Sequence, residues 1–257
     1  MRVKSNAVWH SLPGVVAAYQ PIAAPDPFAA WQNVAHQGAR FGVYTATPGV
    51  APTWSAATGW MFNGSTQYLR TGIAQTSTEW SVLLRFSGYS GSLSAPVFGA
   101  VLSVGPKRSF QMSINVVSAN TLLFANGGTG YVESSPALST GVIGIADKTA
   151  YRNGISSGTI PAGTSATWHE LYVGGVHVDS TVVCGSSTIQ NLVIVSRVLS
   201  PAEVWLASRQ MAYCHINPDW NAWARRRRYY YAPAQAAAAA FNPAWARNAN
   251  NVMQVSL

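Results

Sequence analysis

The sequence predicts an all-β sandwich with one short C-terminal helix and an extended C-terminal arm. Short apolar runs follow one another between residues 54 and 196, separated by Gly, Ser, Asn and Thr, with no helical patterns between them. A single well-capped helical segment comes after the last run. Beyond it the chain shows no periodic pattern that could form a core of its own.

The 257 residues suit one all-β domain, in which we expect three regions. Residues 1–53 contain six prolines and should form an irregular segment packed on the sandwich, with one strand at residues 15–19 and a helical turn beginning at Pro27. Residues 54–213 should form the sandwich and its closing helix. Residues 214–257 should form the arm.

Residues 80–87 are the clearest strand, because apolar and polar side chains alternate along it and only Leu83 breaks the alternation. The Asn153-Gly154 pair predicts a two-residue hairpin turn, since both residues tolerate a positive φ. Further strands are expected at residues 60–62, 67–71, 96–103, 110–116, 121–124, 142–146, 149–152, 170–174 and 189–196.

A helix is expected over residues 200–213. Ser200 is a good N-cap, Pro201 suits the first helical position, and Glu203 stands at the capping-box position. The stripe that should pack on the sandwich consists of Val204, Trp205, Ser208, Met211 and Ala212.

Charged residues make up only 9% of the chain, against roughly 25% in an ordinary soluble domain. Such a surface suits a protein that is largely covered by neighbours in an assembly. No apolar run approaches the roughly 18 residues that a membrane span needs. No N-terminal signal is visible, so we expect synthesis in a cytoplasm and no membrane partner.

The residues that could support catalysis are scattered. No two of the eight acidic residues share a strand at alternating spacing, and no Gly-x-Ser-x-Gly elbow is present. His169 and His177 flank a strand, but no third metal ligand is close in sequence. We therefore expect no enzyme, no cofactor and no metal; a glycosidase would require distant acids to converge in one groove.

The arm carries an unusual block of arginines and aromatic residues. Planar donors followed by ring faces are typical of protein interfaces and also of nucleic-acid contacts, and we favour docking to a protein. The expected docking residues are Trp220, Trp223, Arg225, Arg226, Arg227, Arg228, Tyr229, Tyr230 and Tyr231. Three aromatic residues in loop-like stretches, Trp54, Tyr89 and Trp168, are candidates for glycan contact, with core or interface packing as the alternative.

Four motifs in order resemble the laminin-G-like, concanavalin-A-like jelly rolls. They are Trp-Met-Phe-Asn-Gly-Ser-Thr-Gln-Tyr-Leu at 60–69 with the strand at 80–86, Tyr-Arg-Asn-Gly at 151–154, Leu-Tyr-Val-Gly-Gly at 171–175, and the segment 189–203 that leads into the helix. The flanks at 11–19, 217–220 and 225–231 are similar to those of tailed-bacteriophage members.

The resemblance implies a structural accessory protein of a phage virion, made in the host cytoplasm. It would decorate or cement the capsid, or belong to a head or tail fibre, as a homo-oligomer bound to other virion proteins through its arm. The alternative is a carbohydrate- or receptor-binding adhesion module that contacts a host surface glycan. Asn63 and Gln67 stand where acidic calcium ligands are found in such domains, so no calcium site is carried over.

Overall fold

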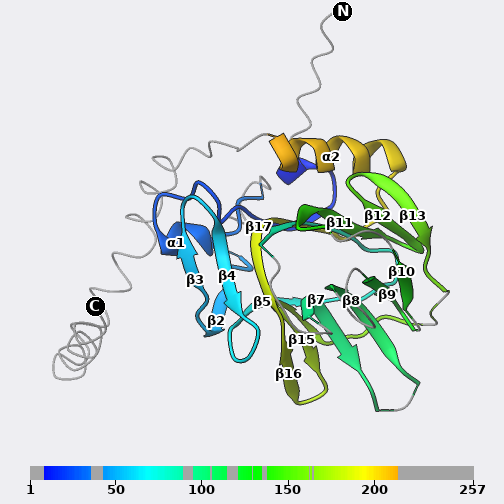
Figure 1. Ribbon diagram of the computed structural model, residues 1–257. Helices are drawn as coiled ribbons and strands as arrows, with labels where there is room; N and C mark the ends of the chain where they lie inside the picture. The colour runs from blue at the N-terminus through cyan, green and yellow to red at the C-terminus, as the bar shows by residue number, and fades with distance from the viewer. Residues whose placement is uncertain are drawn as a thin grey trace, which may run out of the picture. The chain divides into compact units, whose positions relative to one another are not determined.

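The computed structural model describes residues 9–35, 43–88, 95–104, 106–114, 121–128, 130–134, 138–161, 163 and 165–213. They all belong to one unit of the chain, Met1–Ile216; the second unit, Asn217–Leu257, lies outside the described residues. Two sheets stack face to face (Figure 1). This arrangement confirms the predicted all-β sandwich with its closing helix.

The first sheet has eight strands, and its centre is the long strand β17 (Ser186–Val195). One edge of β17 pairs with β6 (Ser81–Ser87), and its other edge is shared between β4 (Gly59–Asn63) and β1 (Val15–Tyr19). The remaining strands are β11 (Thr140–Ala146), β12 (Thr149–Arg152) and β13 (Ile155–Thr159) beyond β6, and β3 (Thr53–Ser55) beyond β4.

The second sheet has nine strands, paired antiparallel except where β15 runs parallel to β7. Its main path runs through β10 (Tyr131–Ser134), β9 (Thr121–Asn126), β8 (Arg108–Ile114), β7 (Ala95–Leu102), β14 (Glu170–Val173), β5 (Tyr68–Ala74) and β2 (Thr47–Val50). The hairpin of β15 (Gly175–Val178) and β16 (Thr181–Cys184) joins it at β7.

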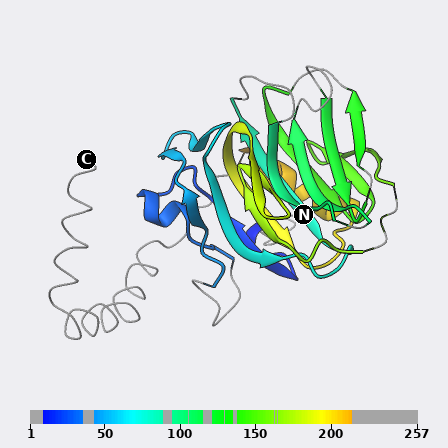
Figure 2. The ribbon, with the colours of Figure 1, turned by 90° about the horizontal axis from the view of Figure 1, so that it is seen from below.

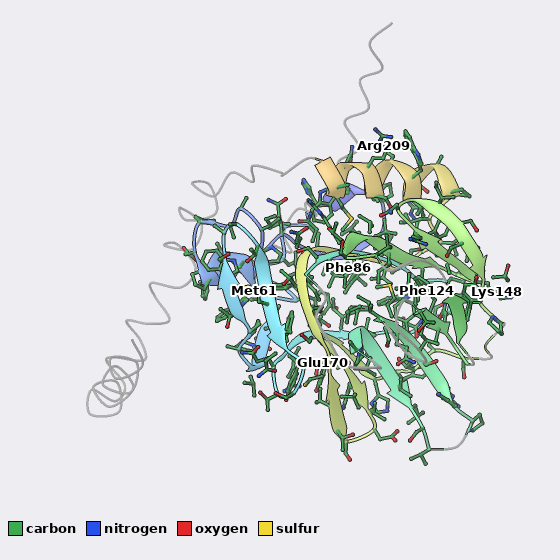
Figure 3. All side chains as sticks on the ribbon, in the orientation of Figure 1. Met61, Phe86, Phe124, Lys148, Glu170 and Arg209 are labelled. Carbon is green, nitrogen blue, oxygen red and sulfur yellow. The ribbon has the colours of Figure 1, made fainter. Side chains whose placement is uncertain are left out.

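Large side chains fill the space between the sheets. Phe86 of β6 and Phe124 of β9 lie in this layer (Figure 3), and both are fully buried. Phe98 and Phe110 meet edge to face, with ring centroids 6.1 Å apart. Every strand predicted from sequence between residues 60 and 196 overlaps a strand of the structure.

The segment before residue 54 contributes to both sheets. Its strand β1 pairs with β17 in the register Tyr19↔Leu192, and β2 pairs with β5. The ring of Tyr19 is fully buried, 6.0 Å from the ring of Trp60. The short helix α1 (Pro27–Ala30) begins at the predicted proline and is capped by Asp26.

Helix α2 (Pro201–Tyr213) covers the outer face of the first sheet. It contacts β6, β11 and the short helix η1 (Trp9–Ser11). Seen from below, the nine-stranded sheet lies nearest the viewer and α2 lies behind it (Figure 2). This cover explains Leu83, which breaks the alternation in β6 and yet is fully buried. None of the helices among the described residues is both long and apolar enough to cross a membrane.

The start of α2 has the predicted capping box. Ser200 Oγ accepts a hydrogen bond from the Glu203 backbone N–H at 3.3 Å, and Glu203 Oε2 accepts one from the Ser200 N–H at 2.8 Å. The predicted stripe is wrong at Trp205, which is 48% exposed, with the Arg209 guanidinium 5.1 Å from its ring centroid. Ala207 is buried in its place, because it lies on the same face as Val204.

Candidate functional site

Four rings form a row on the outer face of the nine-stranded sheet. Alternation along β5 and β14 turns Leu69 and Val173 into the core, so that Tyr68 and Tyr172 lie on the opposite face. Their rings stack with centroids 5.1 Å apart. The ring of Tyr172 also stacks on that of His177 at 4.6 Å, and His169 meets His177 edge-on at 5.0 Å.

The rings of this row cover one another's faces. Tyr68, Tyr172 and His177 are nearly parallel, with interplanar angles of 14° and 5°. Gly49 of β2 closes the Tyr68 end, where an added Cβ would lie within 2.1 Å of the tyrosine ring. The row therefore offers hydroxyl and nitrogen atoms at its edges rather than ring faces. Nδ1 of His177 is buried and has no hydrogen-bond partner among the described residues.

The carboxylates beside the row are already engaged. Glu170 Oε2 accepts hydrogen bonds from Arg70 Nη2 at 2.8 Å and Nε at 3.0 Å, and its Oε1 accepts one from the Gly72 N–H at 2.8 Å. The hydrogen bond to Glu170 raises the pKa of the Arg70 guanidinium. Asp179 accepts hydrogen bonds from the backbone and the hydroxyl of Ser103, which lower the pKa of its carboxyl. Figure 3 places Glu170 away from the core.

Trp168 stands at the His169 end of the row and presents its indole ring to solvent. The side chain is 61% exposed, and it has no aromatic partner among the described residues. Its backbone has φ of 58°, in the left-handed region that bulky side chains avoid. A strained backbone persists only where its surroundings hold it, and such positions cluster at functional sites.

A buried amide network holds this backbone. The N–H groups of Thr167 and Trp168 donate to Oε1 and the backbone carbonyl of Gln75, at 3.3 and 3.2 Å. Gln75 Nε2 donates to Asn126 Oδ1 at 2.9 Å. Asn126 Nδ2 in turn donates to the carbonyls of Thr78 and Asp147, at 2.7 and 2.8 Å. The network joins loops from four parts of the chain behind Trp168.

The structure separates the three predicted glycan contacts. Trp54 is half-buried on β3 in the other sheet, where its Nε1 donates to the Pro21 carbonyl at 2.8 Å. Only Trp168 projects as an exposed ring, since Tyr89 lies outside the described residues. The predicted docking residues Trp220, Trp223 and Arg225 to Tyr231 also lie outside them.

The ring row and the amide network were not expected from the sequence. Tyr68 and Tyr172 meet only because β5 and β14 pair, and nothing local marks that pairing. Within the described ranges, no group of three or more His, Cys, Asp or Glu residues is placed to hold a metal ion. Oδ1 of Asn63 accepts the N–H groups of Ser65, Thr66 and Gln67, and so shapes the turn that crosses from β4 to β5.

The fold is a β-sandwich of the jelly-roll kind, and 157 chains of solved structures match it. No family model and no curated protein matches the sequence. Trypanosoma rangeli sialidase in complex with sialic acid aligns with a TM-score of 0.55 and 17% identity, over 77% of this chain and 33% of the sialidase. The same sialidase with 2,3-difluorosialic acid as the covalent intermediate aligns with a TM-score of 0.55 and 14% identity, over 78% and 33%.

A mutant of HCR/D aligns with a TM-score of 0.54 and 10% identity, over 81% of this chain and 53% of that one. The chain thus spans about a third of the length of the sialidases it matches, and at these identities the likeness establishes the fold alone. It nevertheless corrects one expectation. The prediction that the chain is not an enzyme is contradicted, because sialidases are prominent among the proteins that share its fold.

Proposed function

We propose that the chain is a structural accessory protein of a tailed-phage virion, which decorates or cements the capsid or forms part of a head or tail fibre. The observation that carries the proposal is a well-packed sandwich with a surface poor in charge. Only 9% of the residues are charged, whereas the surfaces of soluble domains are roughly 25–35% charged. A surface of this kind is suited to burial against neighbouring subunits.

Exposed apolar side chains support the same reading. Val104 is 74% exposed, Ile155 68% and Trp205 48%. Ile155 follows Gly154, which packs against the backbone of Trp205, so two of these side chains belong to neighbouring elements, β13 and α2. Contact with another subunit would remove this apolar surface from water.

The motifs that carry the family resemblance occupy defined elements of the sandwich. Residues 60–69 run from β4 through the Asn63 turn into β5, and so connect the two sheets. The Asn153-Gly154 pair forms the predicted turn between β12 and β13, with φ of 51° and 83°. Residues 189–203 include most of β17 and the capped start of α2. This agreement supports the resemblance to phage-encoded jelly rolls.

The arm supplies the contact to the particle in this proposal. Its four arginines, Arg225 to Arg228, and three tyrosines, Tyr229 to Tyr231, offer planar donors and rings to a protein partner. The test replaces the four arginines by alanine in the full chain and measures its copy number in purified phage particles. A double variant, Lys107→Ala with Lys148→Ala, is the control for loss of basic charge, because both lysines are exposed on the sandwich.

We expect the arginine variant to fold and to be missing from particles, and the lysine control to be incorporated normally. Cryo-electron microscopy of particles with the native chain should show it on the capsid lattice or the tail. Absence of the native chain from particles would contradict the virion role. Normal incorporation of the arginine variant would contradict docking through the arm.

A further inference from the structure

Trp168 presents a large, rigid ring at a position where the protein itself gains nothing from it. Its side chain is 61% exposed, yet two backbone hydrogen bonds, from Thr167 and Trp168 to Gln75, fix the chain on which it stands. A side chain that is already oriented loses little conformational entropy when it binds a ligand. The left-handed backbone at φ of 58° is the further sign that this orientation is imposed.

We propose that Trp168 is the stacking platform of a carbohydrate-binding site for an uncharged pyranose, with His169 and His177 beside it as hydrogen-bonding groups. The C–H face of a pyranose ring is apolar and flat, and it packs on an exposed indole face. This site is a property of the sandwich alone. It does not depend on the virion role or on the arm.

The two imidazoles provide the polar part of the site. His169 follows Trp168 directly, and its ring centroid lies 5.0 Å from that of His177. Nδ1 of His177 has no partner among the described residues, although it is buried. A neutral imidazole carries one donor and one acceptor, which complements sugar hydroxyl groups that can do both. An unsatisfied buried nitrogen is destabilising, so a hydroxyl that reached it would be favoured.

The charges around the imidazoles indicate a neutral sugar. Glu170, next in sequence to His169, is tied to Arg70 by two hydrogen bonds. Asp179, whose carboxyl His169 influences electrostatically, is held by Ser103. These groups already satisfy one another and leave no free cation or anion for a uronic acid or an amino sugar. Recognition by stacking and neutral hydrogen bonds follows from this arrangement.

The stacked row supports the site rather than forming the platform itself. Tyr172 lies against the face of His177 at 4.6 Å, and Tyr68 lies against Tyr172. The faces of these rings are therefore occupied by protein, and the stack fixes the plane of the His177 imidazole. A sugar can reach the edges of the row and the exposed face of Trp168.

The test uses the purified full chain on an array of neutral and acidic oligosaccharides, followed by calorimetric titration of the strongest neutral ligand. Trp168→Ala removes the platform and Trp168→Phe keeps part of it. Trp205→Ala is the matched control, because Trp205 is also an exposed tryptophan (48%) but lies on α2. Thermal unfolding of each variant shows whether it is folded, and an exposed ring can be removed without opening the core.

We expect binding to neutral glycans, a loss of affinity of about tenfold or more for Trp168→Ala, a smaller loss for Trp168→Phe, and no change for Trp205→Ala. Three results would each overturn the proposal: no neutral glycan bound, binding to acidic glycans only, or equal affinity of Trp168→Ala and the native chain. Glycan binding by a chain that is absent from phage particles would leave this site standing and remove the virion role.

Discussion

Gln75 and Asn126 form a buried pair of side-chain amides in which Gln75 Nε2 donates to Asn126 Oδ1 at 2.9 Å. The two residues come from the end of β5 and the end of β9, which are not neighbours in the sheet. Each amide also binds backbone groups of a different loop, at Thr167 and at Thr78 and Asp147. The pair therefore fixes several loops at once, including the one that carries Trp168.

Asn126→Ala should lower the free energy of unfolding by about 2–3 kcal/mol, because it leaves two buried carbonyls and one amide without partners. Chemical denaturation measures this change. Hydrogen exchange should also increase at the N–H of Trp168, which depends on the same network. Asn63→Ala, in an exposed turn, is the comparison. Equal losses at both positions would contradict the special role of the buried pair.

Trp168→Gly should be more stable than Trp168→Ala by about 1 kcal/mol, because only glycine adopts a positive φ without steric cost. The same two substitutions at Trp205 should give the opposite order, since alanine is favoured over glycine inside a helix by about 1 kcal/mol. Thermal or urea unfolding of the four variants compares them directly. The same order at both positions would show that the backbone at Trp168 is not strained.

Glu203 should give the fold a pH-dependent contribution. Its hydrogen bonds to Arg197, at 2.6 and 3.1 Å, lower the pKa of its carboxyl from 4.5 to about 2. The ionised form therefore stabilises the protein above about pH 4.5, and this contribution is lost as the pH falls towards 2. Because the pair is partly exposed, we expect about 1 kcal/mol at pH 7.

The measurement is urea unfolding of the native chain and Glu203→Gln between pH 2 and pH 7. The difference in stability between the two should be present at pH 7 and should disappear at the acid end. Glu79→Gln, a change in an exposed loop carboxyl, is the control. A difference that stays constant with pH would show that the ion pair is not its source.

Leu83→Ser would complete the alternation of apolar and polar residues along β6, and yet it should destabilise the protein by about 3 kcal/mol or more. Leu83 is fully buried under α2 and lies against Gly144 of β11. Val104→Ser, at a position that is 74% exposed, should change stability by less than about 0.5 kcal/mol. Denaturant midpoints of the two variants separate burial from local pattern.

Local signals explain what the sequence could predict of the fold. The capping box at Ser200 and Glu203 and the Asn153-Gly154 turn involve only neighbouring residues, and both are present as expected. Alternating and apolar runs marked most strands, because burial on the sheet faces acts along each strand. The exposed strand β2 carries little apolar signal and was not expected. Trp205 was misplaced because an aromatic residue near a helical stripe can also lie on its solvent side.

The site depends on contacts between distant parts of the chain. Arg70 and Glu170 are 100 residues apart in sequence, and they meet through the pairing of β5 with β14. The row of rings needs the additional placement of β15 beside β7. Trp168 could be marked as a loop aromatic, but its strained backbone and its support by Gln75 arise from tertiary structure. Sequence patterns do not encode such registers locally.

The strand β17 has a consequence for how the protein is made. Its partners β1, β4 and β6 are all synthesised at least a hundred residues before it, and the pair Val15↔Val195 joins positions 180 residues apart. During translation these three strands leave the ribosome without the strand that unites them, so their apolar faces and hydrogen-bonding edges wait unpaired. The first sheet can close only after nearly the whole sandwich has emerged, and we expect folding to be post-translational and aided by chaperones.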